Sequence, residues 1–154
     1  MISQVLANVT AVAINGRALL IEGEPGSGKS SLALALIDRG ANLIGDDALT
    51  ITEQSGRIIA APPPNTAGLI EVRNVGIIEL PAVEAPVALV LTLDAAAARF
   101  PLEFGQRRLL DVAIPLLPFA PGDAIQALRA EYALAQYGLT FPNPSGGAKR
   151  DADG

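Results

Sequence analysis

The residues Gly23 to Ser30, Gly-Glu-Pro-Gly-Ser-Gly-Lys-Ser, match the phosphate-binding pattern G-x-x-x-x-G-K-[ST] at every fixed position. Glycines in such a loop allow positive φ angles and turn consecutive N–H groups toward phosphate oxygens. Lys29 supplies a mobile charge for the β- and γ-phosphates, and Ser30 supplies a hydroxyl for Mg²⁺, which prefers a few hard oxygen ligands. We therefore expect a nucleoside triphosphate here, bound by Gly23, Glu24, Pro25, Gly26, Ser27, Gly28, Lys29, Ser30 and Ser31.

The segments on either side of this loop have the order that phosphate binding requires. The apolar run 18–21 is typical of a buried strand, and residues 31–37 are typical of a helix that presents its positive end to the phosphates. The helix is expected to run to about Arg39, with Gly40 as the glycine that ends it. The alternative is a glycine-rich turn that ends in Lys-Ser by chance, which the flanking strand and helix disfavour.

Two adjacent acids follow the next apolar segment. Residues 41–45 predict a strand that delivers Asp46 and Asp47 at its carboxyl end, where ligands bind in α/β sheets. One acid can hold Mg²⁺ through a water, and the other can accept a proton from an attacking hydroxyl. Two neighbouring carboxylates near a metal disfavour ionising together, so we expect coupled protonation. An Asp-Asp turn before a strand at 48–51 is the alternative.

The sheet that holds these strands is expected to be mixed. Residues 9–14 are rich in β-branched side chains, and Asn15-Gly16 separates them from the strand at 18–21, which is a strong signal for an antiparallel hairpin. A polar turn at 53–56 predicts a second hairpin, and 86–93 predicts another buried strand. The fold class is therefore α/β, a single P-loop domain with a mixed sheet flanked by helices.

The composition excludes several function classes. Among 154 residues there is no Cys and no His, which excludes thiol nucleophiles, Ser-His-Asp triads and the usual zinc sites, so a general base must be a carboxylate. The net charge of −5 argues against nonspecific nucleic-acid binding. No apolar run approaches the ~18 residues of a membrane span, and the first residues lack the basic region of a signal peptide. We expect a cytoplasmic protein without nucleic-acid or membrane partners.

The second half of the chain is expected to be mainly architectural. Residues 99–108 predict a polar loop that could serve as a substrate-facing flap, and 122–137 predict a helix. That helix is expected to turn one face into the core, formed by Ala124, Leu128, Tyr132 and Ala135. Residues 1–140 would form the domain, and 141–154 a disordered tail.

The stretch 68–80 contains Glu71 and Arg73, whose spacing puts both side chains on one face of an extended strand. By itself this spacing is equally typical of a surface ion pair.

It is this stretch, Glu71-Val-Arg-Asn-Val-Gly-Ile-Ile78, that most closely resembles the signature of HPr kinase/phosphorylase. Together with the loop at 23–30, Asp-Arg-Gly at 38–40 and the acid pair, the resemblance covers roughly residues 8–130. It is to the family's catalytic domain, in the short form that lacks the N-terminal domain.

The resemblance implies a nucleotide-binding core of the HPr kinase/phosphoenolpyruvate carboxykinase type. It implies that Lys29 binds phosphates, that Ser30 and Glu71 hold Mg²⁺, and that Asp46 is the base for the substrate serine. Asp47 would support Asp46, and Arg73 would help to stabilise the transferring phosphoryl group. ATP and Mg²⁺ would be the cofactors, an HPr-type phosphocarrier protein of the phosphotransferase system the partner, and a homo-oligomer the assembly. The resembling enzymes also catalyse phosphorolysis.

Three positions depart from the family pattern. Asn8 stands where the family has a His beside the acid dyad, and an amide can neither hold a positive charge nor relay a proton. Ser31 replaces an acid, and 114–119 replaces a basic segment, which leaves Arg107 or Arg108 as candidates for a second catalytic arginine. Two functions remain open at this point: an ATP-dependent serine kinase, or a catalytically reduced nucleotide sensor that signals to a partner protein. A small-molecule kinase would need an Arg-rich lid, which we do not find.

Overall fold

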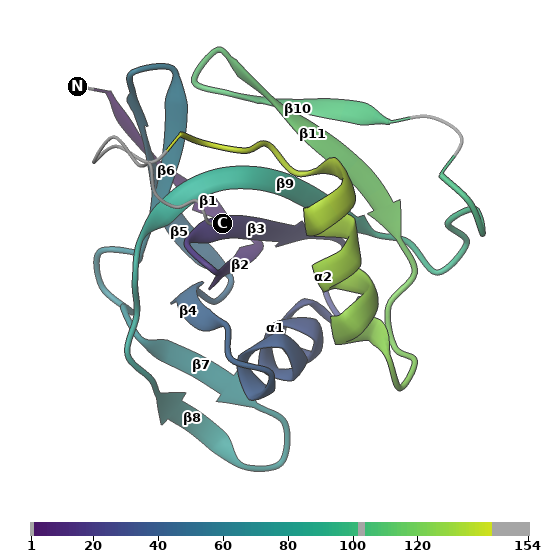
Figure 1. Cartoon of the computed structure of the whole chain (residues 1–154). Helices are drawn as coiled ribbons and strands as arrows, with labels where there is room; N and C mark the ends of the chain where they lie inside the picture. Colours follow the sequence, from purple (N-terminus) through teal and green to yellow (C-terminus); the bar gives the residue numbers. More distant parts are fainter. Residues whose placement is uncertain (1, 102–103, 143–154) are drawn as a thin grey trace.

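The computed structural model describes residues 2–101 and 104–142 and shows a mostly β protein with two helices (Figure 1). The helices are α1 (Lys29–Asp38) and α2 (Gln126–Tyr137). The strands are β1 (Ser3–Ala7), β2 (Val9–Ile14), β3 (Arg17–Glu22), β4 (Asn42–Gly45), β5 (Ala48–Gln54), β6 (Arg57–Ala61), β7 (Leu69–Val72), β8 (Gly76–Glu79), β9 (Ala85–Leu93), β10 (Gly105–Leu109) and β11 (Val112–Phe119).

Nine of these strands form one mixed sheet, as the sequence predicts. The order is β1-β5-β6-β9-β3-β2-β4, and β11 pairs with β9 and carries β10 at its other edge. β2 is antiparallel to both β3 and β4, while β3, β9 and β11 run parallel. The carboxyl ends of β4, β3, β9 and β11 therefore lie along the same edge of the sheet.

The turns of the two predicted hairpins and the end of the first helix have the backbone angles that the sequence predicts. Asn15 and Gly16 both have positive φ, at 51° and 82°, as the tight turn between β2 and β3 requires. Ser55 and Gly56 do the same between β5 and β6, at 54° and 80°. Gly40, with φ of 110°, ends α1 as expected.

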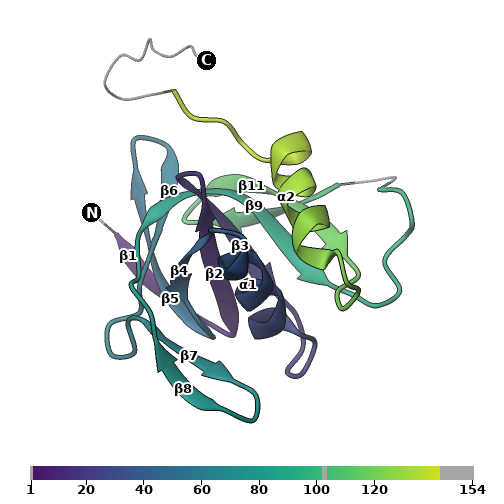
Figure 2. The same cartoon turned by 60° about the horizontal axis from the view of Figure 1, so that its bottom comes forward.

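Both helices pack on one face of the sheet, where their buried side chains share a core with β2, β3 and β9 (Figure 2). A second core on the opposite face is built from strand residues, including Leu20, Ile51 and Val90. The mixed sheet is thus flanked by helices on one side and by folded-over strands on the other. Neither described helix is long and apolar enough to cross a membrane.

The face predicted for the second helix is wrong. α2 begins at Gln126, and its buried residues are Ala127, Ala130, Ala133 and Leu134. Tyr132 is 64% exposed, and Ala124 lies before the helix. Alanines occur on every side of this segment, so the apolar pattern could not single out the face whose small side chains allow close packing.

The structure corrects one further expectation and defines two segments that the sequence left open. Residues 105–109, predicted as part of a flap loop, form β10 and pair with β11. The stretch 68–80, whose secondary structure the sequence left open, forms a hairpin of β7 and β8. β1, for which we predicted no structure, pairs along its whole length with β5. The tail predicted at 141–154 lies outside the described residues from 143 onward.

Gly45 tests the packing that delivers the acid pair. A Cβ at this position would lie 2.3 Å from the carbonyl oxygen of Ala48 and 3.1 Å from Pro63 Cδ. We expect Gly45→Ala to lower the free energy of unfolding by about 1–3 kcal/mol, because the neighbouring backbone must move. Gly105→Ala is the matched control, since its Cβ would meet Leu116 Cδ2 at an ordinary 3.6 Å. Equal urea midpoints for the two variants would contradict this packing.

Candidate functional site

The glycine loop connects β3 to α1, as its sequence predicts. Gly26 and Gly28 have φ of 81° and 106°, and Gly28 occupies the N-cap position of α1. The N–H of Ser27 donates to the carbonyl of Glu24 at 3.0 Å, which closes the loop into a compact turn. The first N–H groups of a helix have no acceptor within the helix, so the start of α1 can stabilise an anion.

Lys29 and Ser27 carry the polar groups of this loop. Lys29 Nζ donates to the carbonyl oxygens of Gly23 at 2.9 Å and Glu24 at 3.3 Å, so its ammonium group lies across the start of the loop. The hydroxyl of Ser27 is buried and has no hydrogen-bond partner within the described structure. A Cβ at Gly23 would lie 2.6 Å from that hydroxyl oxygen, so a side chain at position 23 would displace the hydroxyl. The free hydroxyl and the mobile cation suit a ligand that brings oxygen acceptors.

Asp46 joins the loop to the neighbouring elements. Its Oδ1 accepts hydrogen bonds from Ser30 Oγ at 2.6 Å and from Thr10 Oγ1 at 3.1 Å. Its Oδ2 accepts the N–H of Glu71 at 3.3 Å. One carboxylate therefore connects α1, β2 and β7, and both of its oxygens are oriented by donors.

Asp47 points elsewhere, although it is the next residue. Its φ of 64° turns the chain sharply, its N–H donates to Thr10 Oγ1 at 3.1 Å, and its carbonyl accepts the N–H of Asn8 at 2.8 Å. The residue itself is exposed. The chain does turn at these two residues, as in the alternative reading of the sequence. Asp46 is nevertheless hydrogen-bonded to Ser30, which belongs to the glycine loop.

Glu71 and Arg73 do not share a strand face, because the extended conformation on which this depends ends at Val72. Glu71 is near the end of β7, whereas Arg73 begins the turn Arg73-Asn74-Val75, in which Asn74 has φ of 68°. No ion pair joins the two side chains among the residues described. Asn adopts the left-handed conformation more readily than most residues, so Asn74 was the sequence signal for a turn at this point. The hairpin brings the backbone of Glu71 to Asp46 and leaves both side chains exposed.

Thr10 and Glu22 contact residues of the candidate site or lie next to its loop, and the sequence analysis did not single them out. Thr10, 1% exposed, is the one buried polar residue among those described, and a threonine within an apolar strand was the available signal. Glu22 lies directly before the loop. Its carboxylate accepts a hydrogen bond from Thr92 Oγ1 at 2.8 Å and forms an ion pair with Arg107. Arg108 instead donates to the carbonyl of Asp111 in its own hairpin. Of the two candidate arginines, Arg107 is thus the one that approaches the loop.

The residues present fit a magnesium ion that arrives with a nucleotide. In the described ranges, no three acidic side chains converge into a metal centre of their own. Mg²⁺ does not need such a centre, because it usually takes one or two protein oxygens and completes its shell with phosphates and water. Ser30 Oγ beside the Asp46 carboxylate, with Glu71 nearby, supplies that kind of partial set.

Residues 2–85 match the family model for the HPr serine kinase C-terminal domain. This is more than half of the chain, and the chain therefore belongs to that family. HPr kinase/phosphorylase from Clostridium tetani is 49% identical over 70 residues, which are 46% of this chain and 23% of the relative. The same enzyme from Clostridium acetobutylicum is 48% identical over 71 residues, again 46% and 23%. The matched segment thus spans about a quarter of these curated relatives.

The structure is similar over a larger range than the sequence. The Hpr(Ser) kinase/phosphatase from Coxiella burnetii superposes with a TM-score of 0.74 at 27% identity. The match covers 86% of this chain and 94% of that chain, so it includes elements beyond residue 85. The predicted family resemblance is confirmed, and the fold belongs to the HPr kinase/phosphatase type.

Thr10 gives a direct test of how the acid pair is held. In Thr10→Val the N–H of Asp47 loses its acceptor and Asp46 loses one donor, so we expect a loss of about 1–3 kcal/mol of unfolding free energy. Thr10→Ser keeps the hydroxyl and should lose clearly less. Urea unfolding followed by circular dichroism provides the comparison. If the valine variant were as stable as the serine variant, these two hydrogen bonds would not hold the turn.

Proposed function

We propose that this chain is an ATP- and Mg²⁺-dependent serine kinase that acts on an HPr-type phosphocarrier protein. The observation that carries the proposal is the 2.6 Å hydrogen bond from Ser30 Oγ to Asp46 Oδ1. It places the last residue of the phosphate-binding pattern against Asp46, so that a phosphate bound by the loop would lie close to a carboxylate. Family membership supports the same function.

In this proposal the loop binds and orients the triphosphate. Backbone N–H groups from Gly26 to Ser31 surround the β-phosphate, and Lys29 exchanges its two carbonyl partners for the β- and γ-phosphates. Ser30 and Glu71 would hold the metal, with the Asp46 carboxylate beside Ser30. When bound, Mg²⁺ neutralises charge on the phosphate oxygens.

The acid pair handles the proton. The serine hydroxyl of the acceptor attacks the γ-phosphorus, a new O–P bond forms, the bond to the β-phosphate oxygen breaks and ADP leaves. The proton of the hydroxyl passes to a carboxylate, and we assign this role to Asp46, with Asp47 in support. Arg73, exposed in the β7–β8 turn, would contact the transferring phosphoryl group.

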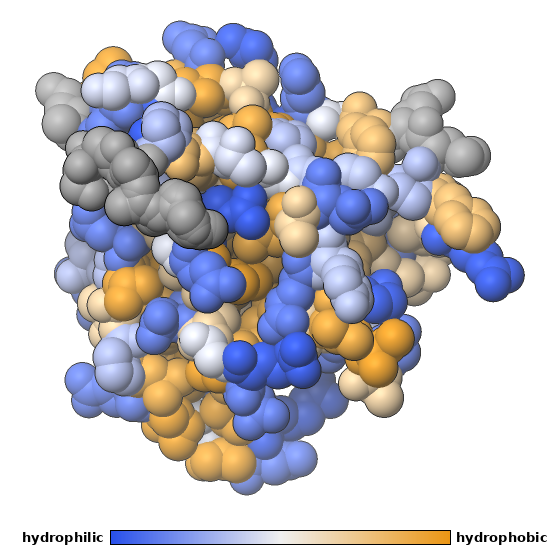
Figure 3. Space-filling view, in the orientation of Figure 1, coloured by the Kyte–Doolittle hydropathy of each residue, from blue (hydrophilic) through white to orange (hydrophobic). Residues whose placement is uncertain are grey.

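The exposed β7–β8 hairpin supports a protein as the acceptor. Val75 and Ile77 are 67% and 63% exposed, and apolar residues gather over this hairpin at the lower edge of the molecule (Figure 3). Exposed apolar patches of this kind commonly mark protein contacts. The patch is continuous along the chain with Glu71, whose N–H donates to Asp46. A serine on a docked protein could thus be presented next to the acid pair.

Incubation with labelled ATP, Mg²⁺ and a purified HPr-type carrier tests the proposal. Phosphoserine on the carrier, absent when its acceptor serine is replaced by alanine, is the expected result. Tight ATP binding without transfer would replace the kinase by the nucleotide sensor, which Asn8 favours because an amide cannot relay a proton at that position. Absence of ATP binding would contradict both.

Lys29→Ala tests the loop. Removal of the charge at the β- and γ-phosphates should weaken Mg·ATP binding by at least ~10-fold and abolish transfer, as charge-assisted contacts to phosphate are strong. Calorimetry measures the affinity. Arg39→Ala is the matched control, because it removes one cation that pairs with Glu131 away from the loop. Unchanged affinity in Lys29→Ala would exclude the loop as the phosphate site.

Asp46→Asn separates the base from the metal ligand. We expect Mg·ATP binding to stay within a few-fold of the parent while transfer falls by ~10²-fold or more, the usual effect of losing a general base. Asp111→Asn, an exposed acid in the β10–β11 turn, controls for the charge change. A parallel collapse of binding in Asp46→Asn would make Asp46 chiefly a metal-side residue, and the base would then be Asp47.

A further inference from the structure

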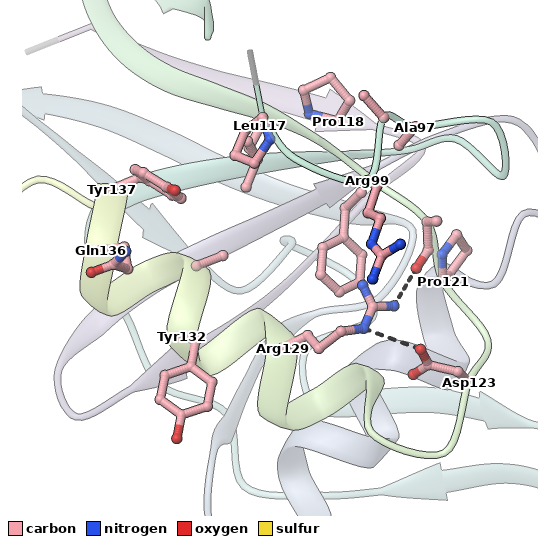
Figure 4. Close-up of a pocket in the computed structure, with 15 residues that line it drawn as sticks. Ala97, Arg99, Leu117, Pro118, Pro121, Asp123, Arg129, Tyr132, Gln136 and Tyr137 are labelled. Atoms are coloured by element: carbon pink, nitrogen blue, oxygen red, sulfur yellow. Dashed lines mark hydrogen bonds and ion pairs between the residues drawn. The ribbon is translucent and has the colours of Figure 1, made fainter. Parts of the chain in front are cut away.

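A pocket of about 570 Å³ lies beside the glycine loop, on the same face of the sheet as the two helices (Figure 4). Its walls come from residues 97–99 and 101 after β9, from the end of β11 with the turn that follows it, and from the side of α2. This volume is in the range of small-molecule sites. None of its residues belongs to the loop or to the acid pair.

The pocket adjoins the loop directly. A Cβ at Gly28 would lie 3.9 Å from Pro121 Cβ, and Pro121 lines the pocket. A Cβ at Gly23 would lie 3.1 Å from Leu93 Cβ, at the end of β9. The pocket thus occupies the carboxyl-end edge of the sheet next to the loop, where α/β folds bind their ligands.

The order of the strands decides which end of a nucleotide would reach the pocket. Along the sheet edge the sequence is β4, β2, β3, β9, β11, so the acids after β4 and the pocket after β9 and β11 lie on opposite sides of the loop. The γ-phosphate end of a bound triphosphate faces Ser30 and Asp46, because these residues accompany the metal and the reacting phosphate. The nucleoside end must then leave the loop on the other side, toward the pocket.

The chemistry of the pocket suits a flat base attached to an anion. The guanidinium of Arg129 lies 4.4 Å from the ring centroid of Phe119, and its position is set by Asp123 at 3.2 Å and by the carbonyl of Ala120. Guanidinium planes and aromatic rings both stack on bases. Arg99 points toward Arg129 in the pocket, so two cations face one carboxylate (Figure 4).

We propose that this pocket is the nucleoside subsite: it binds the base and ribose of the nucleotide whose phosphates lie on the glycine loop. The base stacks on the plane of Arg129 between α2 and residues 97–99, and the excess positive charge of Arg99 and Arg129 attracts the α-phosphate. The proposal rests on the proposed function, since it assigns the remaining part of the same ligand. It makes the affinity for ATP exceed that for inorganic triphosphate.

Calorimetry with ATP and with inorganic tripolyphosphate, each with Mg²⁺, tests the subsite. Ala98→Trp places a large side chain on an exposed position of the pocket wall, and we expect it to weaken ATP binding about tenfold, the scale of one lost base-stacking contact. Tripolyphosphate binding should stay within twofold. Ala95→Trp is the control, because Ala95 is exposed in the same segment and does not line the pocket.

The unmodified protein offers a second readout. It has no tryptophan and two tyrosines, Tyr132 and Tyr137, and both line the pocket. Mg·ATP should change the tyrosine fluorescence at saturation, whereas Mg·tripolyphosphate should leave it unchanged. Equal ATP affinity in Ala98→Trp and the parent, or the same fluorescence response to both ligands, would overturn the subsite and leave the loop assignment intact. Failure of the parent to bind either ligand would instead overturn the proposed function.

Discussion

The hydrogen bond from Ser30 to Asp46 is the interaction on which the rest of the site depends. Ser30 is in the first turn of α1, and Asp46 follows β4, which is separated from the strand of the loop by β2. The two residues meet because β4 runs parallel to β3 and ends at the same sheet edge. Thr10 on the intervening β2 supports the contact by donating to Asp46 and accepting from Asp47.

The long strand β9 provides the second constraint. Its first residues pair with β6, and the remainder pairs with β3 and β11. It therefore fixes the two cores relative to the loop and places the pocket on the side of the loop opposite to the acids. A ligand that spans the loop would touch residues from both halves of the chain, although the family match ends at residue 85.

Local signals in the sequence predicted most of the elements around the loop. The Asn15-Gly16 turn, the glycine that ends α1 and the apolar runs at 18–21 and 86–93 each specify their structure through backbone sterics or burial, which short segments encode. The sequence also predicted that Asp46 follows a strand at the ligand-binding edge of the sheet. The contacts of Thr10 and Glu22 were not predicted, and Arg107 could not be chosen over Arg108, because these contacts join residues 36 to 85 positions apart. The buried face of α2 was predicted wrongly because alanines occur on all sides of this helix and do not distinguish its buried face.

A crystal structure with Mg²⁺ and a non-hydrolysable ATP analogue tests the central claim most directly. Our account predicts the β- and γ-phosphates on the loop of residues 23–31, with the metal bound at Ser30 Oγ and adjacent to Asp46. A triphosphate bound elsewhere, or one on the loop with its metal remote from both Ser30 and Asp46, would contradict it.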